Sequence, residues 1–91
     1  MRISVRFFPP YDEAAGLSAE TLQLDDSPAT VEKFLRMLAE RHPALNKYLE
    51  VESDEAHRRH MIVAVNSKMA RLKDHVNQGD EVKLLPPLAG G

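Results

Sequence analysis

The sequence has 91 residues, of which 43% are hydrophobic and 29% charged, with 12 basic and 14 acidic side chains and a net charge of −2. This size predicts one domain with little interior for a deep catalytic cavity, and the charge argues against nucleic acid as a partner. The chain lacks cysteine, which excludes disulfides and thiol nucleophiles, and no apolar run approaches the roughly 20 residues that span a bilayer, so we expect a cytoplasmic protein with no membrane partner.

The N-terminal part of the chain predicts a β-hairpin. Alternation of polar and apolar residues over 2–7 is typical of a strand with one buried face, and Pro9-Pro10 ends it. Residues 21–24 alternate again and suit the second strand. Residues 11–20 lack periodicity between them, so we expect a loop there.

The clearest helical pattern covers residues 31–41. Its apolar side chains recur at a spacing of three and four residues, at Val31, Phe34, Leu35 and Leu38. Thr30 suits the N-cap position, where its side chain accepts a backbone N–H. Pro43 ends the helix because it forces the preceding residue out of helical geometry.

The segment from 44 to 60 has a weaker pattern. Leu45, Tyr48 and Leu49 fit a short helical turn before a polar loop. The basic cluster His57-Arg58-Arg59-His60 is more typical of a solvated loop than of a site for phosphate or an acidic partner. Two histidines without a third ligand are weak grounds for a metal site, so we expect none.

Two further strands follow. Residues 61–65 are apolar and β-branched, which predicts a strand covered on both sides or nearly so, and a turn at Asn66-Ser67 leads to a short edge segment. Residues 81–85 predict the last strand, with Val82 and Leu84 facing the core. The methionines are interpreted as core fillers: Met37, Met61 and Met69.

The order of these elements is β-β-α-β-β, which predicts an α+β fold. A mixed sheet of four to five strands would pack on one main helix within a domain over residues 1–85. Because a strand stands at each chain end, we expect the first and last strands to lie side by side, parallel, at the centre of the sheet.

The last six residues, 86–91, are expected to form an extended tail of about 20 Å. Pro86-Pro87 cannot extend a strand by pairing. Gly90 and Gly91 have no Cβ, so their backbone fits a slot that excludes other residues. A cut linker or a chance ending is the alternative, but the prolines and apolar residues are unlike a Gly/Ser linker.

Alternation along the last strand points Leu85 away from the core. Together with Phe8 and Leu88, this side chain would form an exposed apolar patch around the tail, which would mark a docking surface. The alternative is that these side chains cover one another. The residues assigned to partner binding are Phe8, Leu85, Pro86, Pro87 and Leu88.

Several motifs together resemble a known family. They are Phe7-Phe8, Thr30-Val31-Glu32, Val65-Asn66, Gly79-Asp80-Glu81-Val82 and the run from Leu84 to Gly91. They resemble the small, sulfur-carrying subunit of molybdopterin synthase and its ubiquitin-like relatives. The resemblance spans nearly the whole chain, its Pro-Pro-x-x-Gly-Gly end is its most specific part, and it implies the β-grasp fold.

The resemblance also implies that the chain is a carrier and not an enzyme by itself. A ubiquitin-activating-like adenylyltransferase would join the Gly91 carboxylate to AMP using Mg-ATP. A sulfurtransferase or other persulfide donor would then convert it to a thiocarboxylate, while Gly90 keeps the slot accessible. Two such tails would feed the large subunit of molybdopterin synthase, in a heterotetramer. No cofactor would stay bound to this chain.

Other functions stay open within the same class and outside it. A similar thiocarboxylate could serve thiamine, cysteine or tRNA thiolation, or the tail could be ligated to lysines as a protein modifier. A different class is a non-covalent β-grasp interaction module with an inert tail. The sequence shows no Ser-His-Asp arrangement, paired catalytic carboxylates or glycine-rich phosphate loop.

Overall fold

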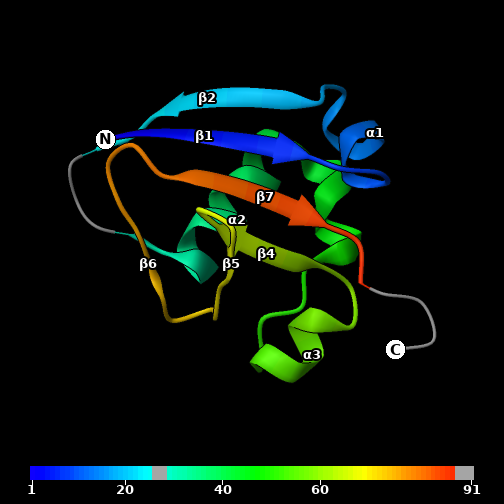
Figure 1. Ribbon diagram of the computed structural model, residues 1–91. Helices are drawn as coiled ribbons and strands as arrows, with labels where there is room; N and C mark the ends of the chain where they lie inside the picture. Colours follow the sequence, from blue (N-terminus) through cyan, green and yellow to red (C-terminus); the bar gives the residue numbers. More distant parts are fainter. Residues whose placement is uncertain (26–28, 88–91) are drawn as a thin grey trace.

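The computed structural model describes residues 1–25 and 29–87, and in them a mixed five-stranded sheet packs on one main helix (Figure 1). The sheet has the strand order β2-β1-β7-β4-β5. Its strands are β1 (Arg2–Phe7), β2 (Ala19–Gln23), β4 (Ile62–Val65), β5 (Lys68–Met69) and β7 (Glu81–Leu85). The predicted α+β arrangement is confirmed.

The first and last strands lie side by side at the centre of the sheet, as the sequence predicts. β1 and β7 run parallel, in a register that extends from Ser4 opposite Glu81 to Phe7 opposite Leu84. β2 pairs antiparallel with the free side of β1, and β4 pairs antiparallel with the other side of β7. The chain therefore leaves the sheet from its middle strand.

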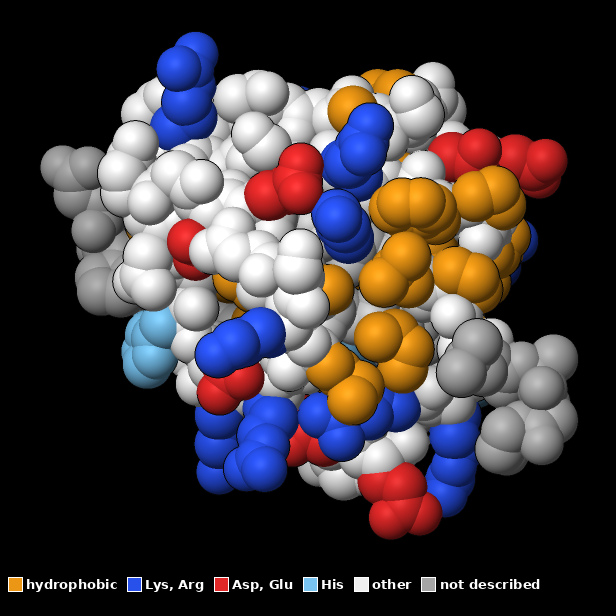
Figure 2. Space-filling view, viewed as in Figure 1, with side chains coloured by type: hydrophobic (Ala, Val, Ile, Leu, Met, Phe, Trp, Pro, Cys, Tyr) orange, Lys and Arg blue, Asp and Glu red, His pale blue; other side chains and the backbone are white. Residues whose placement is uncertain are grey.

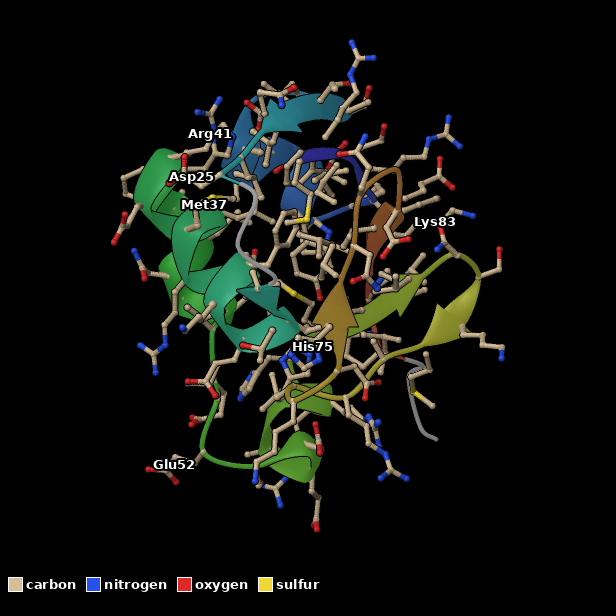
Figure 3. The ribbon with its side chains drawn as sticks, turned by 90° about the vertical axis from the view of Figure 1, so that its left-hand side faces the viewer. Asp25, Met37, Arg41, Glu52, His75 and Lys83 are labelled. Atoms are coloured by element: carbon tan, nitrogen blue, oxygen red, sulfur yellow. The ribbon has the colours of Figure 1, made fainter. Side chains whose placement is uncertain are left out.

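The main helix α2 (Val31–Arg41) has the predicted bounds. The Thr30 hydroxyl oxygen accepts a hydrogen bond from the Lys33 backbone N–H at 3.2 Å, which caps the first turn. His42 ends the helix with φ of −130° before Pro43. Figure 3 shows α2 on one side of the sheet, with Lys83 of β7 pointing to the opposite side.

One core lies between α2 and the facing side of the sheet. The inward residues of β1 and β7 are Ile3, Val5, Phe7, Val82 and Leu84, and all are at most 3% exposed. They meet the apolar stripe of α2, which consists of Val31, Phe34, Leu35 and Leu38. Burial of this kind contributes about 1.5–3 kcal/mol for each large side chain.

The expected loop over 11–20 is wrong at both of its ends, because residues 11–15 are helical and β2 begins at Ala19. Residues Tyr11–Ala15 form a short helix, α1, which ends at Gly16 with φ of 77°. Tyr11 is buried, and its ring meets Tyr48 edge-on with centroids 5.0 Å apart. Five residues are too few for periodicity to reveal a helix, and this one forms because the Tyr11 side chain enters the core.

A small second sheet was not predicted. It pairs β3 (Ala29–Thr30) with β6 (His75–Val76) in antiparallel orientation. Next to it, the backbone N–H groups of Val31 and Glu32 donate to the carbonyl oxygens of Asp74 and Leu72. These contacts satisfy N–H groups that the first turn of a helix otherwise leaves unpaired.

The segment after α2 contains two short helices. The 3₁₀ helix η1 (Pro43–Tyr48) corresponds to the predicted helical turn, whereas α3 (Asp54–Arg58) replaces the expected polar loop. The Ser53 hydroxyl oxygen caps α3 by accepting from the Ala56 backbone N–H at 3.0 Å. His57 on α3 is only 1% exposed, so the interpretation of the basic cluster as a solvated loop is wrong for this residue.

The interpretation of Met69 as a core filler is wrong. This residue is 58% exposed and lies on the short edge strand β5, where both residues are exposed. None of the helices within residues 1–25 and 29–87 combines the length and the apolar character that a membrane span requires.

The buried His57 predicts a pH dependence of stability. Neither of its ring nitrogens has a hydrogen-bond partner among the described residues. Burial lowers the pKa of this imidazole below its usual 6.5, and the nearby Asp54 carboxylate opposes this effect only in part. As the pH falls below 6.5, the unfolded chain takes up a proton that the folded chain does not, so the free energy of unfolding decreases.

Replacement of His57 by leucine removes this titration. We expect the unfolding free energy of His57→Leu, measured by urea denaturation, to fall less steeply than that of the wild type between about pH 7 and about pH 5. His75→Gln, at an exposed histidine, is the matched control and keeps the wild-type slope. An equally steep profile for His57→Leu contradicts the prediction.

Candidate functional site

The candidate site surrounds the point where the chain leaves β7. Because β1 and β7 are parallel, they end at the same edge of the sheet (Figure 1). Phe8 follows β1 at this edge, and Leu85 is the last residue of β7. Pro86 and Pro87 follow without regular secondary structure. The predicted site residues Leu88, Gly90 and Gly91 lie outside the described residues, so their roles stay predictions.

The outer face of the sheet carries an apolar patch at this edge. Leu85 alternates with the buried Leu84, and Ile62 of β4 lies opposite Leu85 in the strand register. We call five residues the tail-exit patch: Phe8, Ile62, Leu85, Pro86 and Pro87. Pro86 is exposed and the other four are half-buried. Figure 2 shows hydrophobic side chains gathered on this part of the face, beside the tail.

Sequence reasoning missed Ile62. Residues 61–65 were expected to form a strand covered on both sides or nearly so, and no residue of this strand was assigned to partner binding. Ile62 is half-buried on the face opposite to α2. The signal that identifies it is the register between β4 and β7, which pairs Ile62 with Leu85. Pairing of this kind is not visible in the alternation of one strand.

Phe8 is fixed in place by its backbone. Its N–H donates to the carbonyl oxygen of Leu84 at 3.1 Å, and its own carbonyl accepts from the Tyr11 N–H at 2.7 Å. These bonds hold Phe8 between the end of β7 and the start of α1. The patch is thus built on a rigid support rather than on a free loop.

Tyr11 connects the two sides of the site. Its hydroxyl donates to the carbonyl oxygen of His60, with 2.5 Å between the oxygens, and so joins α1 to the segment that enters β4. Burial, together with the neighbouring Tyr48, raises the pKa of Tyr11 to about 12. The hydroxyl therefore keeps its proton, and remains a donor, throughout the physiological pH range.

A second group of hydrogen bonds fixes the start of β7. Asn66 donates from Nδ2 to Asp80 Oδ1 at 2.7 Å and accepts from the Glu81 N–H on Oδ1 at 2.9 Å. Asp80 also accepts from the Asn77 N–H on Oδ2 at 2.7 Å. We call Asn66 and Asp80 the β7 clasp. It fixes the start of β7, at the opposite end of the strand from the tail-exit patch.

The chemistry of the site differs from that of a metal centre. No group of three or more His, Asp or Glu side chains among the described residues is arranged to hold a metal. The site combines an apolar surface, rigid backbone support and a chain that leaves the middle of a sheet. This arrangement is suited to presenting a chain end to another protein.

Comparison with known proteins identifies similar chains. A model described as the ThiS family matches residues 5–91. The molybdopterin synthase sulfur carrier subunit of Chlamydomonas reinhardtii is 32% identical over 93 residues, which covers 100% of both chains. The solved structure of small archaeal modifier protein 1 from Haloferax volcanii is 31% identical with a TM-score of 0.77, and the match covers 96% of this chain and 98% of that one.

A third similar structure comes from a complex. It is a chain of the complex between subunits 1 and 2 of molybdopterin-converting factor from Helicobacter pylori, with 26% identity, a TM-score of 0.60 and 100% coverage of both chains. The predicted ubiquitin-like β-grasp fold is confirmed by these likenesses.

The β7 clasp leads to a stability prediction. Asn66→Ala removes two side-chain hydrogen bonds. It also leaves alanine in the left-handed backbone conformation, with φ of 50°, which alanine tolerates less well than asparagine. We expect the free energy of unfolding to fall by about 2 kcal/mol in urea denaturation. Asn66→Gly tolerates the backbone angle and should lose less, because only the hydrogen bonds are missing. An Asn66→Ala variant within about 0.5 kcal/mol of the wild type would show that the clasp is unimportant.

Proposed function

The chain belongs to the ThiS family, and from this premise we propose that it is a sulfur carrier protein for molybdopterin, that is molybdenum cofactor, biosynthesis. The observation that carries the proposal is that the family match extends to Gly91 and so includes the terminal Gly-Gly. Full-length similarity to a molybdopterin synthase sulfur carrier subunit supports the pathway. Gly91 would supply the carboxylate that carries the sulfur.

The chemistry requires activation by another enzyme, because a carboxylate has no leaving group that sulfur can displace. An oxygen of the Gly91 carboxylate attacks the α-phosphorus of Mg-ATP on an adenylyltransferase, and pyrophosphate leaves. The terminal sulfur of a persulfide donor then attacks the acyl carbon and AMP leaves. A second thiol on the donor side cleaves the S–S bond, which releases the thiocarboxylate and leaves a disulfide. The chain acts as a co-substrate throughout.

The tail-exit patch would be the surface on which the large subunit docks. Ile62 and Leu85 are half-buried on the sheet face opposite to α2, and Phe8, which follows β1, is also half-buried. Figure 2 shows hydrophobic side chains gathered on that face. Pro86-Pro87 would direct the tail away from the sheet, because neither proline can pair with a strand. The related H. pylori chain is part of a two-subunit complex, which supports a partner of this kind.

A second function is favoured by one specific observation. The similarity to small archaeal modifier protein 1 covers 96% of this chain, so the activated Gly91 could instead be joined to lysines of other proteins. A ladder of covalent conjugates in cell extract would favour the modifier. A thiocarboxylate and a stable large-subunit complex without such a ladder would favour the sulfur carrier.

The terminal residue gives the direct test. After incubation with the cognate adenylyltransferase, Mg-ATP and a persulfide donor, the intact wild-type chain should gain the mass expected when one oxygen is replaced by sulfur. We expect Gly91→Ala and deletion of Gly91 to abolish this gain, because a Cβ or a shifted carboxylate blocks access to the acyl carbon. Their unfolding free energies should stay within about 0.5 kcal/mol of the wild type, since the predicted domain ends at residue 85.

No mass gain in the wild-type chain with any donor would reject the carrier function and favour a non-covalent module. A large loss of stability on deletion would show that Gly91 is structural.

The docking surface has its own test. We expect Leu85→Asp to weaken binding to the cognate large subunit by at least about 2 kcal/mol in calorimetry, because it places a charge in an apolar contact. Folding should change less, since Leu85 is only half-buried. Gln23→Asp is the matched control: it adds the same charge to the same face, opposite Arg2 at the other end of the sheet. Equal binding by both variants, or unfolding of Leu85→Asp, contradicts the assignment.

A further inference from the structure

A set of basic residues borders the tail-exit patch on the side of β4. Arg58, Arg59 and His60 end α3 and lead into β4, and we call them the basic ledge. In the antiparallel register of β4 with β7, Ile62 lies opposite Leu85. β7 therefore ends at Leu85 next to the point where the ledge enters β4. Figure 1 agrees with this placement, because β7 ends on the side where the chain enters β4.

The ledge is held in a fixed position. The buried side chain of His57 anchors α3, and the carbonyl oxygen of His57 accepts from the N–H groups of His60 and Met61 at 3.0 and 3.1 Å. The His60 carbonyl accepts from the Tyr11 hydroxyl. Because the backbone is already ordered, a partner that contacts the ledge has a smaller entropic cost of binding.

The positive charge of the ledge is poorly neutralised. Arg59 contacts Glu55 at 3.3 Å, but the two side chains are 67% and 85% exposed, and a pair of that kind contributes little in water. The Arg58 Nε atom is buried and has no hydrogen-bond partner in residues 1–25 and 29–87. Figure 2 shows Lys and Arg side chains along the lower part of this face, with some acidic side chains among them.

The sequence places this charge in a basic region. Residues 57–91 contain 6 basic and 3 acidic side chains, whereas residues 1–56 contain 6 basic and 11 acidic ones. The surface beside the tail therefore combines an apolar part, formed by the tail-exit patch, with a cationic border on one side. Arginine side chains bind carboxylates well, because the planar guanidinium donates two parallel hydrogen bonds.

We propose that the basic ledge docks against an acidic surface of the large subunit that covers the tail-exit patch. This inference rests on the proposed function. The apolar patch alone leaves the rotation of the two proteins about the tail poorly defined, whereas charge on one border selects one orientation. Complementary charge also accelerates the encounter of the two proteins. The ledge thus aligns the tail with the large subunit.

The test is the rate of association with the cognate large subunit, measured by stopped-flow fluorescence at low and high salt. We expect Arg58→Gln/Arg59→Gln to associate about tenfold more slowly than the wild type at low salt. The difference should narrow at high salt, because ions screen the attraction beyond about 10 Å at 0.1 M. Arg59→Gln alone, at an exposed residue, should show part of the effect. This single variant still tests the inference if the Arg58 substitution unfolds α3.

Arg36→Gln provides the matched control. Arg36 lies on α2, on the other side of the sheet, and contacts Glu32 four residues earlier at 3.2 Å, just as Arg59 contacts Glu55. Its association rate should equal that of the wild type. If the ledge variants are no slower than Arg36→Gln, the inference is wrong while the sulfur-carrier function stands.

Two other outcomes are also decisive. If the ledge variants form the thiocarboxylate more slowly but bind the large subunit as the wild type does, the ledge contacts the activating enzyme instead, and the assignment is wrong. Failure of the wild-type chain to bind the large subunit at all would overturn the docking proposal together with this inference.

Discussion

The parallel pairing of β1 with β7 is the constraint on which the rest of the molecule depends. It places Val5 beside Val82 and Phe7 beside Leu84, all buried in the core. Without β7 the sheet would separate into β2-β1 and β4-β5, and α2 would have no continuous surface to cover. Because this contact joins the two ends of the chain, the core closes only when the last strand has been made, and such non-local pairing slows folding.

The same pairing gives the sheet two faces that differ in burial. The face of the sheet toward α2 is filled by the core, while the opposite face contributes less buried surface. At one edge, that opposite face carries the half-buried Ile62 and Leu85 beside the strand end. The β7 clasp, Asn66 with Asp80, holds the other end of the same strand. A partner therefore meets a surface whose geometry is set by the core.

The elements that depend on the local spacing of apolar residues were predicted from the sequence. The spacing of apolar residues predicted the helix over 31–41, and alternation predicted both central strands, so Leu85 could be assigned to the outer face from the sequence. The short α1 and α3 were not predicted, because each has only five residues and a buried side chain, Tyr11 or His57, that helical periodicity does not reveal. The partner of Tyr11, the His60 carbonyl, lies 49 residues along the chain. The contribution of Ile62 follows from strand register, which one sequence does not reveal.

The exit from a central strand has a mechanical consequence. A protease or unfoldase that grips the end of this chain pulls along the axis of β7. The hydrogen bonds that join β7 to β1 and to β4 lie across that axis, so they carry the load together and must break at nearly the same moment. An edge strand would instead peel away one bond at a time. The fold therefore resists being unfolded by a pull applied from this end of β7.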